Sequence, residues 1–193
     1  MLRELKQAQY PKCAFCREPV PKTMEEINHN LMKRVKANDP DAIFKMGVKC
    51  NEQGDYEGAL KNWKKAAELG DMDAHFNLSL SYLEGSGVEK DMKRSVYHLE
   101  EAAIGGHPCA RYNLACYAGQ SGNHDRAMKH FMIVANLGDD GALDMVKKGF
   151  MDGYVSKDDY ASTLRGHQAA VNATKSKQRE EGYAFYAQTA TWY

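Results

Sequence analysis

Ala74-His-Phe-Asn-Leu-Ser-Leu-Ser-Tyr-Leu-Glu-Gly-Ser-Gly-Val-Glu-Lys-Asp91, which continues to Glu101-Ala-Ala-Ile-Gly-Gly106, is the stretch that indicates the fold. The alanine that opens it recurs at positions 42, 110 and 142, and the glycine that closes it recurs at positions 70 and 138. A period of 32 to 36 residues is too long for one helix and suits a stacked pair of helices. The sequence therefore predicts an array of helical hairpins.

Each period divides into a helix A, a turn and a helix B. The first helix A is expected to start at Asp39-Pro40, because an aspartate cap followed by a proline favours a helix start. Glycine-containing turns join the two helices, and the second turn, from Glu84 to Asp91, is the longest. The glycine at the end of each helix B accepts the left-handed backbone of a helix C-terminus, so each hairpin is expected to end there.

The pattern Ala-x-x-Asn-Leu, then Tyr-x-x-Gly-x-Gly-Val-x-x-Asp and a helix ending Ala-Ala-x-x-Gly, resembles the Sel-1-like repeat (SLR), a relative of the tetratricopeptide repeat. The resemblance covers roughly residues 41–152. It implies an all-α fold, a right-handed α-α solenoid of SLR hairpins with N- and C-terminal capping helices. The first and third units lack the Gly-x-Gly-Val insertion, and the fourth has only a recognisable helix A.

The chain is expected to divide into four segments. Residues 1–22 contain a Cys-x-x-Cys motif, and residues 23–38 form a capping helix that begins at the capping box Thr23-Met-Glu-Glu26. Residues 39–155 hold the repeats. Residues 156–193 hold a second capping helix, which begins at Ser156-Lys-Asp-Asp159, and an aromatic tail that either folds back as a cap or binds a partner.

Charge and hydropathy argue against several classes of function. The chain has 26 basic and 26 acidic residues, a balance that disfavours a protein built to bind nucleic acid or an anionic membrane. No apolar run approaches the length of about 18 residues that a membrane span needs, and the N-terminus lacks the apolar core of a signal peptide. We therefore expect a cytoplasmic or nucleocytoplasmic protein that contacts neither nucleic acid nor membrane.

The strongest chemical motif is Lys12-Cys-Ala-Phe-Cys-Arg-Glu-Pro-Val-Pro21, in which Cys13 and Cys16 have the spacing of zinc ligands. The motif resembles the closing knuckle of a RING finger, and joined to SLR units it resembles the RING plus SLR family of diatoms and related algae. That resemblance implies a truncated zinc-binding domain, with a ubiquitin-conjugating enzyme as a partner of the intact form. Tetrahedral zinc needs two more ligands, so zinc at Cys13 and Cys16 and a metal-free remnant both stay open. The other three cysteines have the pattern of reduced, buried core thiols: Cys50, Cys109 and Cys116.

Equivalent side chains on successive helices A are expected to line one face of the array, its concave face. The repeat register places Lys45, Asn77 and Asn113 at one such position and Lys49, Ser81 and Tyr117 at another. This ladder suits hydrogen bonding to a peptide backbone or to a terminal carboxylate. The same asparagine is also what SLR units normally carry, so a purely structural role stays open as well.

These observations favour a non-catalytic scaffold that binds a partner protein or peptide on the concave face. The sequence contains no phosphate-binding loop, no Gly-x-Ser-x-Gly elbow and no His-Glu-x-x-His motif, so no catalytic residue is assigned. No cofactor is expected beyond the open question of zinc. The alternative is the substrate-binding part of a RING-type ubiquitin ligase whose zinc-binding domain is truncated here.

Overall fold

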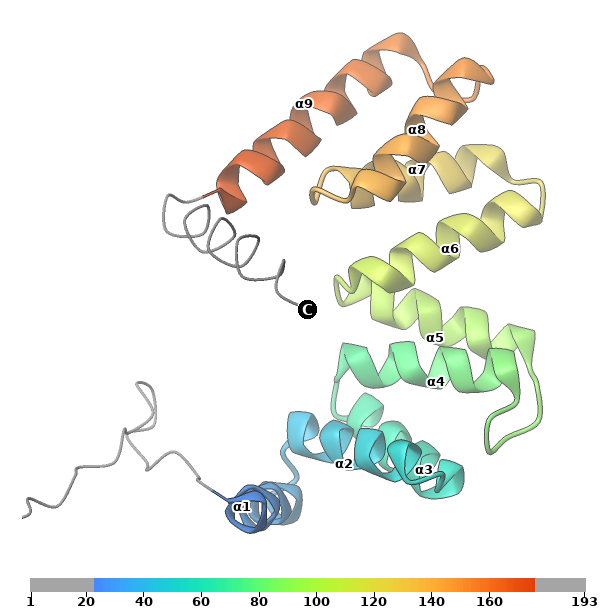
Figure 1. The fold of residues 1–193 in the computed structure, drawn as a ribbon. Coiled ribbons are helices and arrows are strands. Elements are labelled where there is room, and N and C mark those ends of the chain that lie inside the picture. The colour runs from blue at the N-terminus through green and yellow to red at the C-terminus, as the bar shows by residue number, and fades with distance from the viewer. Residues whose placement is uncertain (1–22, 176–193) are drawn as a thin grey trace, which may run out of the picture. The chain divides into compact units, whose positions relative to one another are not determined.

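The structure is a computed structural model that describes residues 23–175 of the 193-residue chain. All regular structure in that range is α-helical, which confirms the predicted all-α class (Figure 1). The helices are α1 (Met24–Lys36), α2 (Pro40–Glu52), α3 (Tyr56–Glu68), α4 (Met72–Glu84), α5 (Met92–Ile104), α6 (Pro108–Gln120), α7 (His124–Ala135), α8 (Asp140–Met151) and α9 (Lys157–Thr174). No helix in this range is long and apolar enough to cross a membrane.

The chain forms two compact units, Met1–Asp71 and Met72–Tyr193. In the described part, unit 1 contains α1 to α3 and unit 2 contains α4 to α9. The predicted helices A are α2, α4, α6 and α8, and the predicted helices B are α3, α5 and α7. Within unit 2, α4 pairs with α5 and α6 with α7, α8 packs on α7, and α9 packs against both α7 and α8 (Figure 1).

The residues predicted to start helices do so through direct hydrogen bonds. Asp39 Oδ1 accepts from the amide of Ala42 at 3.3 Å, so the first helix A begins where the sequence predicts. At the two capping boxes, the hydroxyls of Thr23 and Ser156 accept from the amide three residues further on, at 3.2 and 3.1 Å. These bonds satisfy amides that have no partner within the helix, and so they define the helix starts.

Each helix B ends at a residue with a left-handed backbone. Gly70, Gly106 and Gly138 have φ angles of 88°, 92° and 95°, as their place in the repeat predicts. Asn38, which follows α1, has a φ of 56° and occupies the same place in its turn. The next amide then donates back to the carbonyl of Arg34 at 3.1 Å, as the amide after Gly70 donates to Ala66 at 3.0 Å. Helix α1 therefore ends in the way that a helix B ends.

The core of unit 1 lies between α2 and α3. Ala42 and Ile43 of α2 are fully buried, and Leu60 and Trp63 of α3 are 5% exposed. The indole of Trp63 lies so close to Gly47 that a Cβ at that glycine would be 2.5 Å from its Cδ1. Trp63 is therefore accommodated because position 47 has no side chain.

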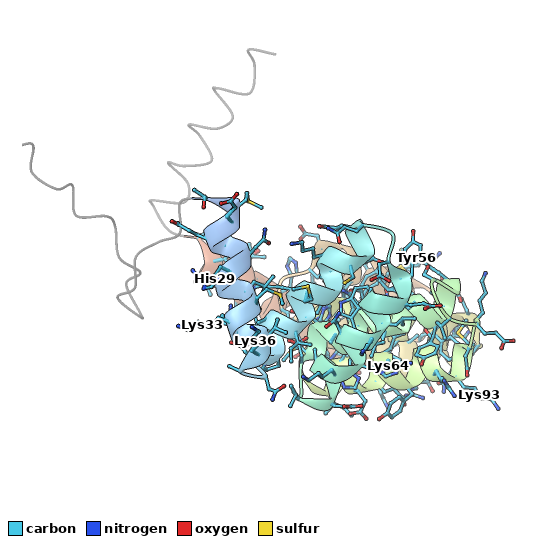
Figure 2. The ribbon with its side chains drawn as sticks, turned by 90° about the horizontal axis from the view of Figure 1, so that it is seen from below. His29, Lys33, Lys36, Tyr56, Lys64 and Lys93 are labelled. Carbon is cyan, nitrogen blue, oxygen red and sulfur yellow. The ribbon has the colours of Figure 1, made fainter. Side chains whose placement is uncertain are left out.

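Helix α1 contributes no buried side chain to unit 1. Its apolar Met24, Ile27 and Met32 remain 70%, 43% and 44% exposed. Lys33 and Lys36 extend from its C-terminal turn into solvent (Figure 2), where the helix dipole favours positive charge. Since apolar burial is slight, α1 relies on the polar contacts to α2 that are described below.

Unit 2 contains two buried clusters. One joins Leu99, Ala102 and Ala103 of α5 to Ala110 and Leu114 of α6. The other spans α6, α7 and α8 and includes Phe131, Val134 and Val146. Small residues at repeat-equivalent positions let the helices approach closely, so the repeat register determines how the hairpins of this unit stack.

Candidate partner-binding site

The two ladder lysines of unit 1 make contacts within that unit. Lys45 pairs with Asp41, one turn earlier on α2, with 2.9 Å between Nζ and Oδ1. Lys49 Nζ donates to Asn28 Oδ1 of α1 at 2.9 Å. A partner that bound these lysines would therefore compete with contacts that already exist.

Arg34, in the last turn of α1, extends this polar network. Its Nε lies 2.8 Å from Asp39 Oδ2, and its Nη2 lies 2.6 Å from Asp41 Oδ2. The hydrogen bond from Arg34 is the main cause that lowers the pKa of Asp39, and the hydrogen bond from Lys45 is the main cause that lowers the pKa of Asp41. These side chains are largely exposed to water, so the network orients α1 on α2 more than it stabilises the fold.

The ladder residues of unit 2 differ from one another in accessibility. Asn77 on α4 and Asn113 on α6 are half-buried, and Tyr117 on α6 is 38% exposed. Ser81 is only 5% exposed, and its hydroxyl donates to the carbonyl of Asn77 at 3.0 Å. The expectation that Ser81 contacts a partner is wrong, because this small side chain is buried and bonds to the backbone of its own helix.

Asn113 and Tyr117 line a groove between α4 and α6, with α5 beneath it, which we call the α4/α6 groove. It encloses a cavity of about 230 Å³. Its lining consists of Ser79, Leu80 and Leu83 from α4, Met92, Ser95, Val96 and Leu99 from α5, and Asn113, Cys116, Tyr117 and Gln120 from α6. Most of these side chains are apolar and none is an acid or a base of the Asp, Glu, Lys, Arg or His type. The carboxamides of Asn113 and Gln120 provide hydrogen-bonding groups on the α6 wall.

A second groove, between α6 and α8 over α7, repeats the first; we call it the α6/α8 groove. Its cavity has a volume of about 500 Å³. Every residue that lines the α4/α6 groove has a repeat equivalent in the lining of the α6/α8 groove. The equivalent lies 36 residues later in the sequence for residues of α4, and 32 residues later for residues of α5 and α6. Leu99 is thus replaced by Phe131 and Asn113 by Met145, while Lys148 and Asp152 at the α8 wall bring opposite charges that the first groove lacks.

Helix α6 connects both grooves to a third cavity. Cys116 lines both grooves, and Asn113 lines the α4/α6 groove together with a cavity of about 380 Å³ between the N-terminal halves of α6 and α8. This third cavity, which we call the Tyr112 cavity, is also lined by Tyr112, Asp139 and Gly141. Burial raises the pKa of the Tyr112 hydroxyl and of the Cys116 thiol, so both are protonated at neutral pH. The shared wall therefore presents neutral groups.

Sequence reasoning missed the apolar residues that form most of the lining. Leu83 of α4 and Met92 of α5 are 44% and 47% exposed, although both are large and apolar. The sequence feature that could have indicated this lining is the width of the apolar side of α4. Leu80 and Leu83 lie outside the set of α4 residues that the core fully buries, so the apolar side of α4 is wider than its buried side.

The metal-type cysteines Cys13 and Cys16 lie outside the described residues. Between residues 23 and 175, no group of three or more His, Cys, Asp or Glu side chains is placed to hold a metal ion. The remaining cysteines are free thiols, half-buried at Cys50 and Cys116 and exposed at Cys109. The expectation of a buried core thiol is wrong at Cys109, because this residue lies in the first turn of α6 with its side chain in solvent.

Stacked helical hairpins, with grooves between successive helices A, define a helical-repeat protein of the solenoid class. The Sel1 repeat family matches residues 40–71, 73–107 and 110–139, half of the chain, and the chain belongs to this family. The matched segments coincide with the hairpins α2–α3, α4–α5 and α6–α7. The predicted SLR repeats are therefore confirmed.

Two solved structures and one curated protein are similar to this chain. The antigen c5321 of uropathogenic Escherichia coli, which displays an SLR fold, aligns with a TM-score of 0.61 and 25% identity over 76% of this chain and 33% of its own. A Sel1 repeat protein from Oxalobacter formigenes aligns with a TM-score of 0.57 and 26% identity over 64% and 98%, respectively. HcpC of Helicobacter pylori strain J99, which carries a provisional beta-lactamase name, is 36% identical over 56 residues. That match covers 29% of this chain and 19% of HcpC, so the chain spans about a fifth of this curated relative.

Proposed function

We propose that this chain is a non-catalytic scaffold whose unit 2 binds an apolar segment of a partner protein in the α4/α6 and α6/α8 grooves. Sel1 repeat proteins generally mediate protein–protein interaction, and the proposal assigns that role to two specific grooves. The observation that carries it is the position-by-position equivalence of the two linings. An open apolar groove at the same place in successive hairpins suits a ligand that runs along the array.

The spacing of the grooves defines the shape of this ligand. Helix α6 lies between the two grooves, and a helix with its side chains is about 10–12 Å wide, so neighbouring grooves are separated by roughly that distance. A segment in the extended polyproline II conformation advances about 3.1 Å per residue and returns to the same face every third residue, so side chains three residues apart span about 9 Å on one face. Asn113 and Gln120 each carry amide donors and a carbonyl acceptor, which suit a peptide backbone. The proposed ligand is an extended, uncharged segment with bulky apolar side chains at positions i and i+3.

Part of the predicted ladder belongs to this proposed surface. Asn113 and Tyr117 are included because they line the α4/α6 groove, and Asn77 because it is the repeat equivalent of Asn113. Lys45 and Lys49 belong to unit 1 and remain a separate proposal for partner contact, since a partner would first have to displace their present neighbours on α1 and α2.

The proposed function is binding alone, with no catalytic step. The thiol of Cys116, which lies between the two grooves, is kept protonated by burial and suits packing better than nucleophilic attack. The beta-lactamase name belongs to HcpC, a longer protein. An assay with a chromogenic cephalosporin tests this part: we expect no hydrolysis by the purified chain above the buffer rate, and hydrolysis above that rate would contradict it.

Peptide selection on the purified full chain tests the binding proposal. Peptides from a random library are selected for affinity, and their binding is then measured to variants by fluorescence polarisation. Leu83→Glu places a charge in the α4/α6 groove and Met145→Glu places one in the α6/α8 groove; each is expected to weaken binding at least about tenfold. Met151→Glu is the matched control, because Met151 is on α8, is 70% exposed and lines neither groove. Equal binding by all three folded variants would overturn the proposal.

The ubiquitin-ligase alternative rests on residues 12–21 alone. Its test is the coding sequence upstream of Met1: an in-frame extension with the remaining RING ligands would favour the substrate-binding part of a ligase, with a ubiquitin-conjugating enzyme as partner. We also propose that the protein acts in the cytoplasm, which imaging of a tagged chain would test. Zinc analysis of the purified chain decides whether Cys13 and Cys16 hold metal, and stoichiometric zinc would contradict the remnant hypothesis.

A further inference from the structure

We infer that residues 183–193 of this same chain occupy the grooves of unit 2, where they compete in cis with the partner segment. The inference rests on the proposed function, because it assigns a second ligand to the same grooves. Residues 183–193 lie beyond the described part of the chain. Three observations support their assignment: their composition, the position of the last described residue, and the placement of all three cavities along α6.

The tail has the chemistry that the grooves favour. Residues 183–193 read Tyr-Ala-Phe-Tyr-Ala-Gln-Thr-Ala-Thr-Trp-Tyr, with five aromatic side chains and no Asp, Glu, Lys, Arg or His. Tyr183 and Tyr186 are three residues apart, which is the spacing expected for anchors in neighbouring grooves when the segment takes the polyproline II conformation. Because the lining of the α4/α6 groove is also free of such charges, an aromatic segment can fill it without burying an unpaired charge. The preceding residues, 175–181, are mostly charged and suit solvent.

Helix α9 ends close to the Tyr112 cavity. A Cβ built on Gly138, in the turn between α7 and α8, would lie 3.5 Å from Ala170 and 3.8 Å from Val171 of α9. The next residue, Asp139, lines the Tyr112 cavity. A helix rises about 1.5 Å per residue, so Lys175 lies within roughly 10 Å of this turn. Residues 176–182 span up to about 23 Å when extended, which is enough to bring Tyr183 to the cavity.

The three cavities adjoin one another along α6. The Tyr112 cavity and the α4/α6 groove share Asn113, and the α4/α6 and α6/α8 grooves share Cys116. Helix α6 is therefore the common wall of all three. An extended segment from residue 183 to residue 193 spans roughly 35 Å, long enough to contact more than one of them.

Tethering makes even a weak tail effective. A short linker of this reach holds its ligand at an effective concentration of about 1 mM. A tail with an intrinsic dissociation constant near 0.1 mM would therefore fill the grooves most of the time, and it would weaken the binding of a competing partner about tenfold. The tail thus sets a threshold affinity that a partner must exceed.

The test measures binding of a fluorescent synthetic peptide of residues 176–193 to full-length proteins. The open variant carries Tyr183→Ser, Tyr186→Ser and Trp192→Ser, and its matched control carries Gln188→Ser, Thr189→Ser and Thr191→Ser in the same segment. We expect the open variant to bind the peptide at least tenfold more tightly than the wild type or the control. Adding Leu83→Glu to the open variant should abolish that gain.

Three other results would overturn the inference. Equal, groove-dependent binding by the open variant and the wild type would show that the tail does not occupy the grooves, while leaving the proposed function intact. Binding that Leu83→Glu does not affect would place the tail elsewhere. Blocking that appears only at high protein concentration, together with dimers in analytical ultracentrifugation, would assign the grooves to the tail of a second copy. Failure of the proposed function itself would give a different result: the library-selected peptides would then bind the wild type and the groove variants with equal affinity.

Discussion

The first hairpin, α2–α3, and the second hairpin, α4–α5, carry different side chains at one pair of facing positions. In the first, Gly47 lies under the indole of Trp63, which leaves no room for a side chain at position 47. In the second, the equivalents are Ser79 and Leu99, and both line the α4/α6 groove. The third hairpin has Ala115 and Phe131 there, and both line the α6/α8 groove. The comparison indicates that the residue on helix A limits the side chain that can lie against it. We call Gly47 and Trp63 a filled pair, because the indole occupies the space of a side chain at position 47, and Ser79 and Leu99 an open pair, because both line a groove.

Disrupting the filled pair of the first hairpin is expected to give the largest effect. Trp63→Leu removes a buried indole and should lower the free energy of unfolding by about 2–4 kcal/mol. Gly47→Ser should lower it by about 1–3 kcal/mol, because the new Cβ meets the indole. Leucine leaves the space that serine needs, so the double variant should recover about 1–2 kcal/mol relative to the sum. Urea unfolding followed by circular dichroism measures all four proteins of this cycle, and strictly additive losses would contradict the comparison.

The reverse exchange tests whether the open pair of the second hairpin controls binding. Ser79→Gly together with Leu99→Trp gives it the pair found in the first, and the indole is expected to fill much of the 230 Å³ cavity. Affinity for a peptide selected on the wild-type chain should fall about tenfold, or 1.4 kcal/mol, measured by fluorescence polarisation. Leu99→Trp alone is the control and should cost about 1–3 kcal/mol of stability, because Ser79 remains in place. Unchanged affinity in a folded double variant would separate the cavity from binding.

The same comparison explains how far the sequence could predict this molecule. The hairpins, their register and their starts at residues such as Asp39 follow from local signals that repeat every 32 to 36 residues, and the structure confirms them. The ladder was a weaker prediction because repeat register shows which residues are equivalent, but not which face each helix buries. Repeat register therefore does not predict that Ser81 is buried while its equivalent Tyr117 is exposed.

The grooves were harder still to predict, because each depends on side chains from three helices. Leu80, Val96 and Cys116 are far apart in sequence and meet only once the hairpins stack. The volume left between them depends on differences of a few atoms at positions such as Leu99, which no periodic pattern records. The exposure of Cys109 has a similar cause, since it depends on where the first turn of α6 faces.

A smaller effect is expected where α1 and α3 end. Both helices end at a residue with a left-handed backbone, which is Asn38 after α1 and Gly70 after α3. Asn38→Gly should raise the free energy of unfolding by about 0.5 kcal/mol, because glycine adopts this conformation without the steric penalty of a Cβ. Gly70→Ala should lower it by about 1 kcal/mol. Urea unfolding checks both, and a loss of stability in the Asn38 variant would show that its side chain has a role beyond the turn.

The smallest expected effect concerns pH, and it distinguishes the third hairpin from the first. His130 on α7 occupies the place that Asn62 occupies on α3, and its Nδ1 is buried with no hydrogen-bond partner among the described residues. Burial, then the charges of Arg126 and Arg111, lower the pKa of His130, and Glu100 opposes them.

The imidazole of the unfolded chain titrates near 6.5, so just below that pH the unfolded chain binds more protons than the folded chain. The contribution of His130 to stability is therefore lost as the pH falls from 6.5 toward the lowered pKa of the folded state. His130→Asn should therefore lose less stability than the wild type between pH about 7.5 and about 5.5 in urea unfolding. His29→Asn, an exposed change on α1, is the matched control and should follow the wild type. If wild type and His130→Asn lose stability equally over this range, the other histidines or the carboxylates dominate the acid response.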